Sequence, residues 1–141
     1  MELTDIIASL NALLEPQKYH DYAPNGLQVE GRHEVRRIVT GVTACLDLIE
    51  AAHERSADMI LVHHGWFWKR EDVRITGVRY KRIASLLAAD MSLAAYHLPL
   101  DDHPELGNNV LLGRTLGFIA DGRFGEDDLG WIGQPEEELP V

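Results

Sequence analysis

Asp58-Met-Ile-Leu-Val-His-His64 is the stretch of sequence from which the fold can be worked out. Residues 58–62 form a nearly continuous apolar run of strand length, which is typical of a strand that is buried on both faces. Upstream, residues 37–42 are rich in β-branched side chains and predict another strand, and residues 46–55 repeat apolar side chains at helical spacing. Strand, helix and strand in succession predict a β-α-β unit with parallel strands.

The same alternation continues on both sides of this unit. Residues 80–89 predict a helix, residues 92–96 a further buried strand and residues 107–116 a last helix. At the start of the chain, residues 3–14 carry apolar side chains three and four positions apart, and Pro16 ends that helix. We therefore expect an α/β fold with a mostly parallel sheet and helices on both of its faces.

Composition and charge restrict the class of protein. A length of 141 residues, with 45% hydrophobic and 26% charged residues, predicts one folded domain. The net charge of −10 argues against nucleic acid and anionic membranes as partners. Cys45 is the single cysteine and cannot form an internal disulfide, and no apolar run approaches the roughly 20 residues that span a bilayer. We expect a cytoplasmic protein.

Potential metal ligands follow two of the predicted strands, at the point where each strand ends. His63 and His64 come directly after the 58–62 run, His97 directly after the next buried strand, and Asp101 four residues further on. Ligands of open parallel sheets gather outside the carboxyl ends of the strands. His97 follows His64 by 33 residues, about one β-α-β unit, so the two strands can be neighbours. Imidazole and carboxylate groups suit divalent Zn, Fe, Mn, Ni or Co and do not distinguish among them.

The adjacent pair His63-His64 bears on the number of ions. Successive side chains of a strand point to opposite faces, so one ion cannot easily use both, whereas two ions could. Two cations about 3.5–4 Å apart, bridged by a carboxylate such as Asp101, are the arrangement that many hydrolases of phosphates and amides use. The alternative is structural, because a histidine pair at a strand end is often only hydrogen-bonded or exposed to solvent.

The last stretch of the chain differs in composition from the rest. Residues 121–141 hold seven acidic residues, one basic residue and four glycines, with only scattered apolar side chains. We expect residues 1–118 to form a single α/β metal-binding lobe and residues 119–141 to be an acidic, linker-like tail. Such a tail predicts that the protein continues into a further C-terminal part.

Four motifs resemble a known family, and together they cover about residues 19–118. They are Asp21-Tyr-Ala-Pro-Asn-Gly-Leu-Gln-Val-Glu-Gly31, Ile38-Val-Thr-Gly-Val-Thr43, Val62-His-His-Gly-Trp-Phe-Trp-Lys69 and His97-Leu-Pro-Leu-Asp-Asp-His-Pro-Glu-Leu-Gly-Asn-Asn109. In these motifs the chain is similar to the NGG-interacting-factor-like family, the YbgI-type proteins that are often labelled GTP cyclohydrolase I type 2 homologues.

The resemblance implies an α/β fold, a dinuclear metal centre and a ring-shaped hexamer. It places His63, His64, His97 and Asp101 on the family's metal-ligand positions. It also implies a second half of the protein, with a further His and Glu that complete the two metal sites, and no residue after Gly117 matches that half. The chain therefore resembles only the N-terminal half of the family.

Other polar and aromatic residues have two interpretations each. The aromatic residues at 66–68 and Tyr96 could stack on a planar heterocycle, but aromatic clusters are more often core or subunit interface, and we favour a subunit interface for them. Asp102 and His103 could orient metal ligands, although exposure to solvent is the favoured interpretation. Asn25 is explained by the Asn-Gly turn.

Asn108 and Asn109 stand at the start of the last predicted helix, where Asn caps well, and we favour capping over contact with a substrate. Cys45 has the features of a small buried residue and not those of a nucleophile.

Together these features predict a metal-dependent hydrolase of the cyclohydrolase or amidohydrolase type, acting on a cyclic amide or nucleotide-like small molecule. The resemblance supplies that label, and the sequence identifies no catalytic residue beyond the four metal ligands. Two alternatives remain open: a non-catalytic metal-binding or interaction module in a homo-oligomer, and an incomplete lobe of the family fold.

Overall fold

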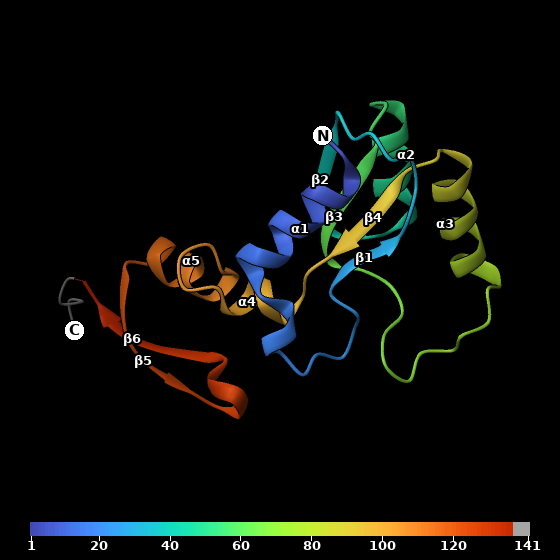
Figure 1. Ribbon diagram of the computed structural model, residues 1–141. Coiled ribbons are helices and arrows are strands. Elements are labelled where there is room, and N and C mark those ends of the chain that lie inside the picture. The colour runs from blue at the N-terminus through green and yellow to red at the C-terminus, as the bar shows by residue number, and fades with distance from the viewer. Residues whose placement is uncertain (137–141) are drawn as a thin grey trace. The chain divides into compact units, whose positions relative to one another are not determined.

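The computed structural model describes residues 1–136, and these form two compact units. The first unit runs from Met1 to His97 and the second begins at Leu98 (Figure 1). This boundary differs from the single lobe expected over residues 1–118, because the last helix packs against a β-hairpin of its own unit. Residues 137–141 of the expected tail lie outside the described residues.

The first unit is built on a four-stranded sheet with the strand order β1-β4-β3-β2. The strands are β1 (Gly26–Val29), β2 (Ile38–Thr43), β3 (Met59–His64) and β4 (Ser92–Ala95). β3 pairs in parallel with both β2 and β4, whereas β1 pairs antiparallel to β4. The prediction of a mostly parallel sheet is confirmed, and the antiparallel edge strand is a feature that the sequence pattern did not reveal.

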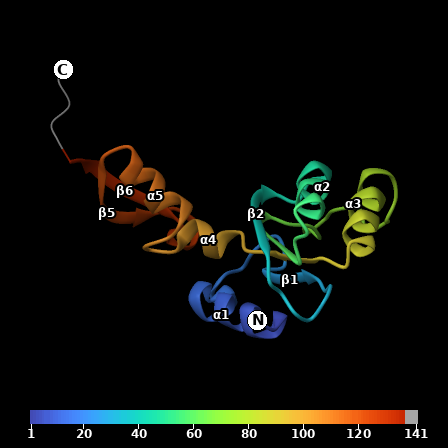
Figure 2. The same ribbon diagram turned by 90° about the horizontal axis from the view of Figure 1, so that it is seen from above.

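Three helices cover this sheet. Figure 2 shows α1 (Leu3–Leu14) on one side of the sheet, and α2 (Leu46–Glu54) and α3 (Gly77–Ala88) on the other. After α1, Glu15 adopts a left-handed conformation and Pro16 opens a short 3-10 turn. Pro16 has no backbone N–H with which to continue the helical hydrogen bonds. Within residues 1–136, no helix has both the length and the apolar character required to cross a bilayer.

The core of the first unit lies between the sheet and helices α2 and α3. Alternate residues of the two central strands face this side, with Ile60 opposite Leu93 and Val62 opposite Ala95. The residues that pack with them are Ala44, Ile49, Ala52, Ala57, Trp66, Leu86 and Met91. Because the register aligns β3 with β4, the residues that follow these strands leave the sheet at the same edge.

The second unit contains two helices and a hairpin. They are α4 (Leu98–Asp102), α5 (Asn108–Thr115), β5 (Phe118–Phe124) and β6 (Gly130–Pro135), and α5 contacts both strands. α5 agrees with the helix predicted over residues 107–116. α4 was not predicted, because a single turn is too short to show helical periodicity.

Most of the expected acidic tail forms structure, where a linker was predicted. Residues 118–135 form an antiparallel hairpin, and Gly125, at a φ of +87°, begins the connection between its strands. Glycine adopts that backbone conformation without strain. Sequence pattern could not reveal the hairpin, because apolar side chains such as Ile119 and Ile132 are exposed and the strands do not alternate between buried and exposed positions.

A buried carboxylate ties the segment before β2 to the start of β3. Asp58 accepts hydrogen bonds from the backbone N–H groups of Arg36 (2.8 Å) and Arg37 (2.9 Å), and from Nη1 of Arg32 (2.9 Å). Burial raises the pKa of the Asp58 carboxyl, but these donors outweigh burial, and the pKa ends below its usual 3.8. The ionised form of Asp58 therefore stabilises the fold.

We expect Asp58→Asn to lower the free energy of unfolding at neutral pH by about 2–4 kcal/mol, because an amide offers one acceptor oxygen where three donors converge. The folded-state pKa is depressed, so the wild-type advantage is present above the unfolded pKa and is lost as the pH falls through the folded pKa. Urea unfolding of both proteins from about pH 6 down to about pH 2 should show the difference shrinking. A constant difference would contradict a role for the charge.

Candidate metal centre

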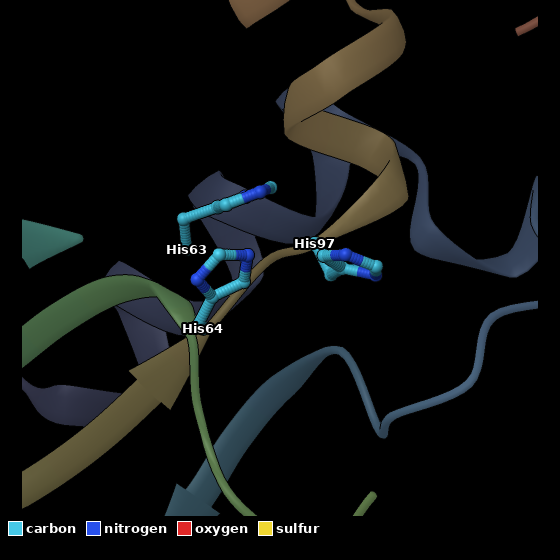
Figure 3. A group of neighbouring side chains, drawn as sticks. All are labelled: His63, His64 and His97. Carbon is cyan, nitrogen blue, oxygen red and sulfur yellow. The ribbon is translucent and has the colours of Figure 1, made fainter. Parts of the chain in front are cut away.

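Three histidines come together at one edge of the first unit. His63 and His64 are the last two residues of β3, and His97 is the second residue after the end of β4. One ring nitrogen of each lies within 4.8 Å of the others, and the ring centroids are 4.4, 5.0 and 5.6 Å apart (Figure 3). Parallel pairing of the two strands brings the side chains together, as expected.

His63 is held by a group that can only accept a hydrogen bond. Its Nδ1 lies 3.1 Å from the backbone carbonyl oxygen of Tyr96. Because a carbonyl cannot donate, Nδ1 carries the proton, and the lone pair of the neutral ring is on Nε2. Metal-binding histidines need this arrangement, in which one nitrogen binds the ion while the other donates to a neighbouring acceptor.

His97 is held in a similar way by a carboxylate. Its Nδ1 lies 2.8 Å from Oδ1 of Asp21, whose side chain is 4% exposed. Asn25 accepts a hydrogen bond from the backbone N–H of His97 at 2.7 Å and donates from Nδ2 to Asp21 at 2.9 Å. Carboxylate and histidine pairs of this kind commonly orient metal ligands.

His64 differs from the other two in the partner of its ring. Its Nδ1 lies 3.2 Å from the hydroxyl oxygen of Thr43, which can donate or accept, so this contact does not set the tautomer. Trp68 lies on one side of the cluster, with ring centroids 4.9 Å from His97, edge-on at 81°, and 5.9 Å from His64. The indole ring of Trp68 therefore flanks the histidine cluster.

The turn after the histidine pair is held tightly. A Cβ on Gly65 would lie 2.3 Å from Oε1 of Gln28 and 2.5 Å from Cβ of Ala95, so the turn requires a glycine here. Gln28 accepts from the backbone N–H of Trp66 at 2.6 Å and donates to its carbonyl at 3.1 Å. These contacts attach the end of β3 to β1 and β4.

Asp101 belongs to the second unit, and its role as a ligand stays a prediction. It lies in α4, and its Oδ1 accepts a hydrogen bond from Nδ2 of Asn108 at 2.9 Å. The next carboxylate, Asp102, pairs with Arg123, and Nδ1 of His103 accepts hydrogen bonds from the backbone of the following turn. Asp102 and His103 are half-buried, so the expectation of solvent exposure is wrong for both.

Several interpretations of individual residues change. The turn interpretation of Asn25 is incomplete, because the side chain also holds His97. Capping by Asn108 and Asn109 is wrong, because Gly107 is the N-cap of α5 and the two amides donate to other groups. Trp66 lies in the core of the first unit, where a subunit interface was the favoured interpretation. The only sequence signal for the support of His97 was a loop with two polar residues four positions apart, Asp21 and Asn25.

The donor set fits a divalent cation. Imidazole nitrogens bind zinc at about 2.0–2.1 Å, which puts two of them about 3.4 Å apart in a tetrahedral site. Nitrogens within 4.8 Å of one another can reach one ion by small ring rotations, or can serve two ions that lie close together. A cluster of three imidazoles with no thiolate suits zinc and the other first-row divalent ions.

Similarity to known proteins agrees with this fold. The Duf34/NIF3 (NGG1p interacting factor 3) family matches residues 1–141, beyond the stretch that carries the four motifs. The GTP cyclohydrolase 1 type 2 homolog of Vibrio cholerae is 59% identical over 115 residues, which are 82% of this chain and 46% of that protein. The homolog of Pasteurella multocida is 53% identical over 141 residues, which are 100% of this chain and 53% of that protein.

Solved structures give the same result. The structure of the protein ybgI, of unknown function, has a TM-score of 0.86 and 48% identity, over 87% of this chain and 50% of that one. TTHA1606 from Thermus thermophilus has a TM-score of 0.82 and 37% identity, over 88% of this chain and 51% of that one. The chain spans about half the length of these relatives. By sequence and by structure, the chain belongs to the Duf34/NIF3 family.

Proposed function

We propose that this chain binds divalent metal ions through His63, His64 and His97, with Asp101 as a further ligand. The strongest argument for the proposal is that two of the imidazole rings are held by hydrogen-bond acceptors. A backbone carbonyl stands behind His63 and a carboxylate behind His97, at 3.1 and 2.8 Å. Both partners favour the tautomer in which Nε2 can bind a cation.

Two cations per complete site are proposed. The ligands suit Zn, Fe, Mn, Ni and Co alike and do not identify the metal. The rings of His63 and His64 lie 4.4 Å apart and the three ligand nitrogens lie within 4.8 Å of one another, a spacing at which the imidazoles could serve two ions that lie close together. Asp101, which the family resemblance places on a ligand position, would be our candidate for a carboxylate shared by the two cations.

We further propose that the site belongs to a metal-dependent hydrolase that acts on a cyclic amide or nucleotide-like substrate. The support is the shared name of the curated relatives, GTP cyclohydrolase 1 type 2 homolog. A bound divalent cation would supply Lewis acidity, which lowers the pKa of water and polarises the bond to be cleaved. The chain's own contribution is to hold the His63 and His97 rings in the required tautomer, with the Trp68 ring beside His97.

A second candidate is a non-catalytic metal-binding or interaction module, or an incomplete lobe of the family fold. It is favoured by the finding that the chain spans about half the length of its relatives. Each missing ligand leaves a coordination position to water. The two candidates differ in turnover, since only a hydrolase converts a substrate when metal is bound.

A homo-oligomer is proposed as the assembly, and the resemblance implies a hexamer. The second unit exposes many large apolar side chains, and contiguous patches of this kind mark interaction surfaces. They are Leu106, Leu111, Leu112, Leu116, Phe118, Ile119, Phe124 and Ile132. The cytoplasmic location stays a prediction.

Zinc-loaded protein is expected to retain metal through gel filtration, and His63→Ala, His64→Ala and His97→Ala should each lose at least about half of it, because each removes an imidazole ligand. Metal per chain is measured by inductively coupled plasma mass spectrometry. His53→Ala, which removes an exposed histidine from the same unit, is the matched control and should retain the wild-type content.

Asp101→Asn, compared with Asp121→Asn in the same unit, tests the further ligand by the same measurement. Wild-type content in all three histidine variants would reject the site, whereas wild-type content in Asp101→Asn alone would remove only that carboxylate.

If the chain is a hydrolase, incubation with GTP as the first substrate should give products that depend on added metal. Turnover should fall at least about 100-fold with a chelator and in His64→Ala, as expected when the Lewis acid is lost. Product formation is followed by liquid chromatography, with His53→Ala as control. Bound metal without turnover of GTP or of a panel of cyclic amides would favour the non-catalytic module.

Light scattering coupled to gel filtration should give a mass at least twice that of the 15.8 kDa chain. Leu112→Glu and Ile132→Glu, which place charges in the exposed apolar surface of the second unit, should reduce that mass. A monomeric wild-type chain at concentrations of about 100 μM would reject assembly through this surface.

A further inference from the structure

The loop at residues 19–25 directly precedes β1, which pairs with β4, and it holds His97, which is 72 residues further along the chain than Asn25. Two side chains of the loop make this contact, those of Asp21 and Asn25. Neither is a ligand in the proposed metal site. Their hydrogen bonds nevertheless determine where the proton on the His97 ring must be.

Donors whose direction is certain fix the orientation of the Asn25 amide. The backbone N–H of His97 can only donate, so the Asn25 atom that it meets at 2.7 Å must be the oxygen. The nitrogen of the same amide must then be the atom that lies 2.9 Å from Oδ2 of Asp21. Asn25 therefore donates to Asp21.

Both oxygens of Asp21 consequently meet donors. Oδ2 accepts from the Asn25 amide, and Oδ1 accepts from the backbone N–H of Tyr22 at 2.6 Å. Oδ1 also lies 2.8 Å from Nδ1 of His97. Because an imidazole is a stronger base than a carboxylate, the proton between these two atoms belongs to Nδ1. His97 is then left with its lone pair on Nε2.

We propose that Asp21, oriented by Asn25, is a positioning residue that selects the Nε2-binding tautomer of His97 and so raises the affinity of the site for divalent cations. The inference rests on the proposed metal-binding function. The carboxylate is required as such, because one amide cannot accept from both Tyr22 and Asn25. An Asn at position 21 would turn its nitrogen either toward Asn25, where two donors would meet, or toward Nδ1 of His97, where it would stabilise the opposite tautomer.

Asp21→Asn is the test variant and Asp58→Asn is its matched control. The control makes the same chemical change at another buried carboxylate of the same unit that accepts backbone N–H groups, away from the histidines. Zinc affinity is measured by competition with a chromogenic chelator. We expect Asp21→Asn to weaken it about 10–100-fold, the usual effect of removing a partner that orients a metal-bound histidine, and Asp58→Asn to leave it unchanged.

The second readout needs no metal. Long-range ¹H–¹⁵N spectra of the metal-free protein, assigned with His97→Gln, report which ring nitrogen carries the proton. Wild type and Asp58→Asn should show His97 protonated on Nδ1, and Asp21→Asn should show a mixture or the opposite tautomer. A variant that only destabilised the fold would not change the position of the ring proton selectively in His97. His63 serves as the internal reference, because its backbone carbonyl partner is retained in Asp21→Asn.

The outcomes separate this inference from the proposed function. If the wild type binds no zinc, the metal site is rejected, and the tautomer spectra still decide whether Asp21 sets the state of His97. If the wild type binds zinc and Asp21→Asn keeps both its affinity and the Nδ1–H tautomer, the positioning role is overturned. Equal loss of affinity in Asp21→Asn and Asp58→Asn would overturn it as well, since general destabilisation would then explain the effect.

Discussion

Parallel pairing of β3 with β4 is the constraint on which the candidate site depends. The register that places Val62 opposite Ala95 puts the ends of both strands at the same level, so His63, His64 and His97 emerge side by side. A slip of one residue would exchange the faces of every side chain on β3 and would bury an imidazole where Val62 now packs. The apolar core prevents the slip, because Ile60 and Leu93 are fully buried on the side of the sheet that α2 and α3 cover.

The strands bring the rings together, but loops decide their chemical state. The 19–25 loop supplies the carboxylate behind His97, and its Tyr22 carbonyl accepts a hydrogen bond at 2.6 Å from the backbone N–H of Lys69 in the loop after β3. That second loop carries Trp68 beside the histidines and holds Phe67 at a φ of +65°, which is uncommon for a residue with a side chain. The two loops are thus connected, and each contributes one wall of the candidate site.

Sequence pattern predicted the parts of the molecule that are organised by burial. The strand at residues 58–62, the α2 and α3 helices and the meeting of the histidines all follow from apolar periodicity and from the geometry of parallel sheets. The hairpin of the second unit did not follow, because strands with exposed side chains on both faces carry no such pattern.

The support of His97 could not be predicted either. A hydrogen bond between a loop carboxylate and an imidazole depends on the path of the chain, and local composition does not encode it. The proximity of Asp21 to His97 results from the antiparallel addition of β1 to β4, which places the preceding loop at the histidine edge. Asp21 stands in a motif that the sequence analysis identified, but the sequence did not show that its hydrogen-bond partner is His97.

The separation in sequence between Asp21 and His97, 76 residues, has a consequence during synthesis of the protein. The ribosome makes the 19–25 loop first and the histidine pair of β3 next. His97, which contacts both, is made last of the three. Domains fold as units once enough of the chain has emerged. A nascent chain that has exposed only the pair at 63 and 64 therefore lacks the assembled cluster, which can form only after the residues that follow β4 have been made.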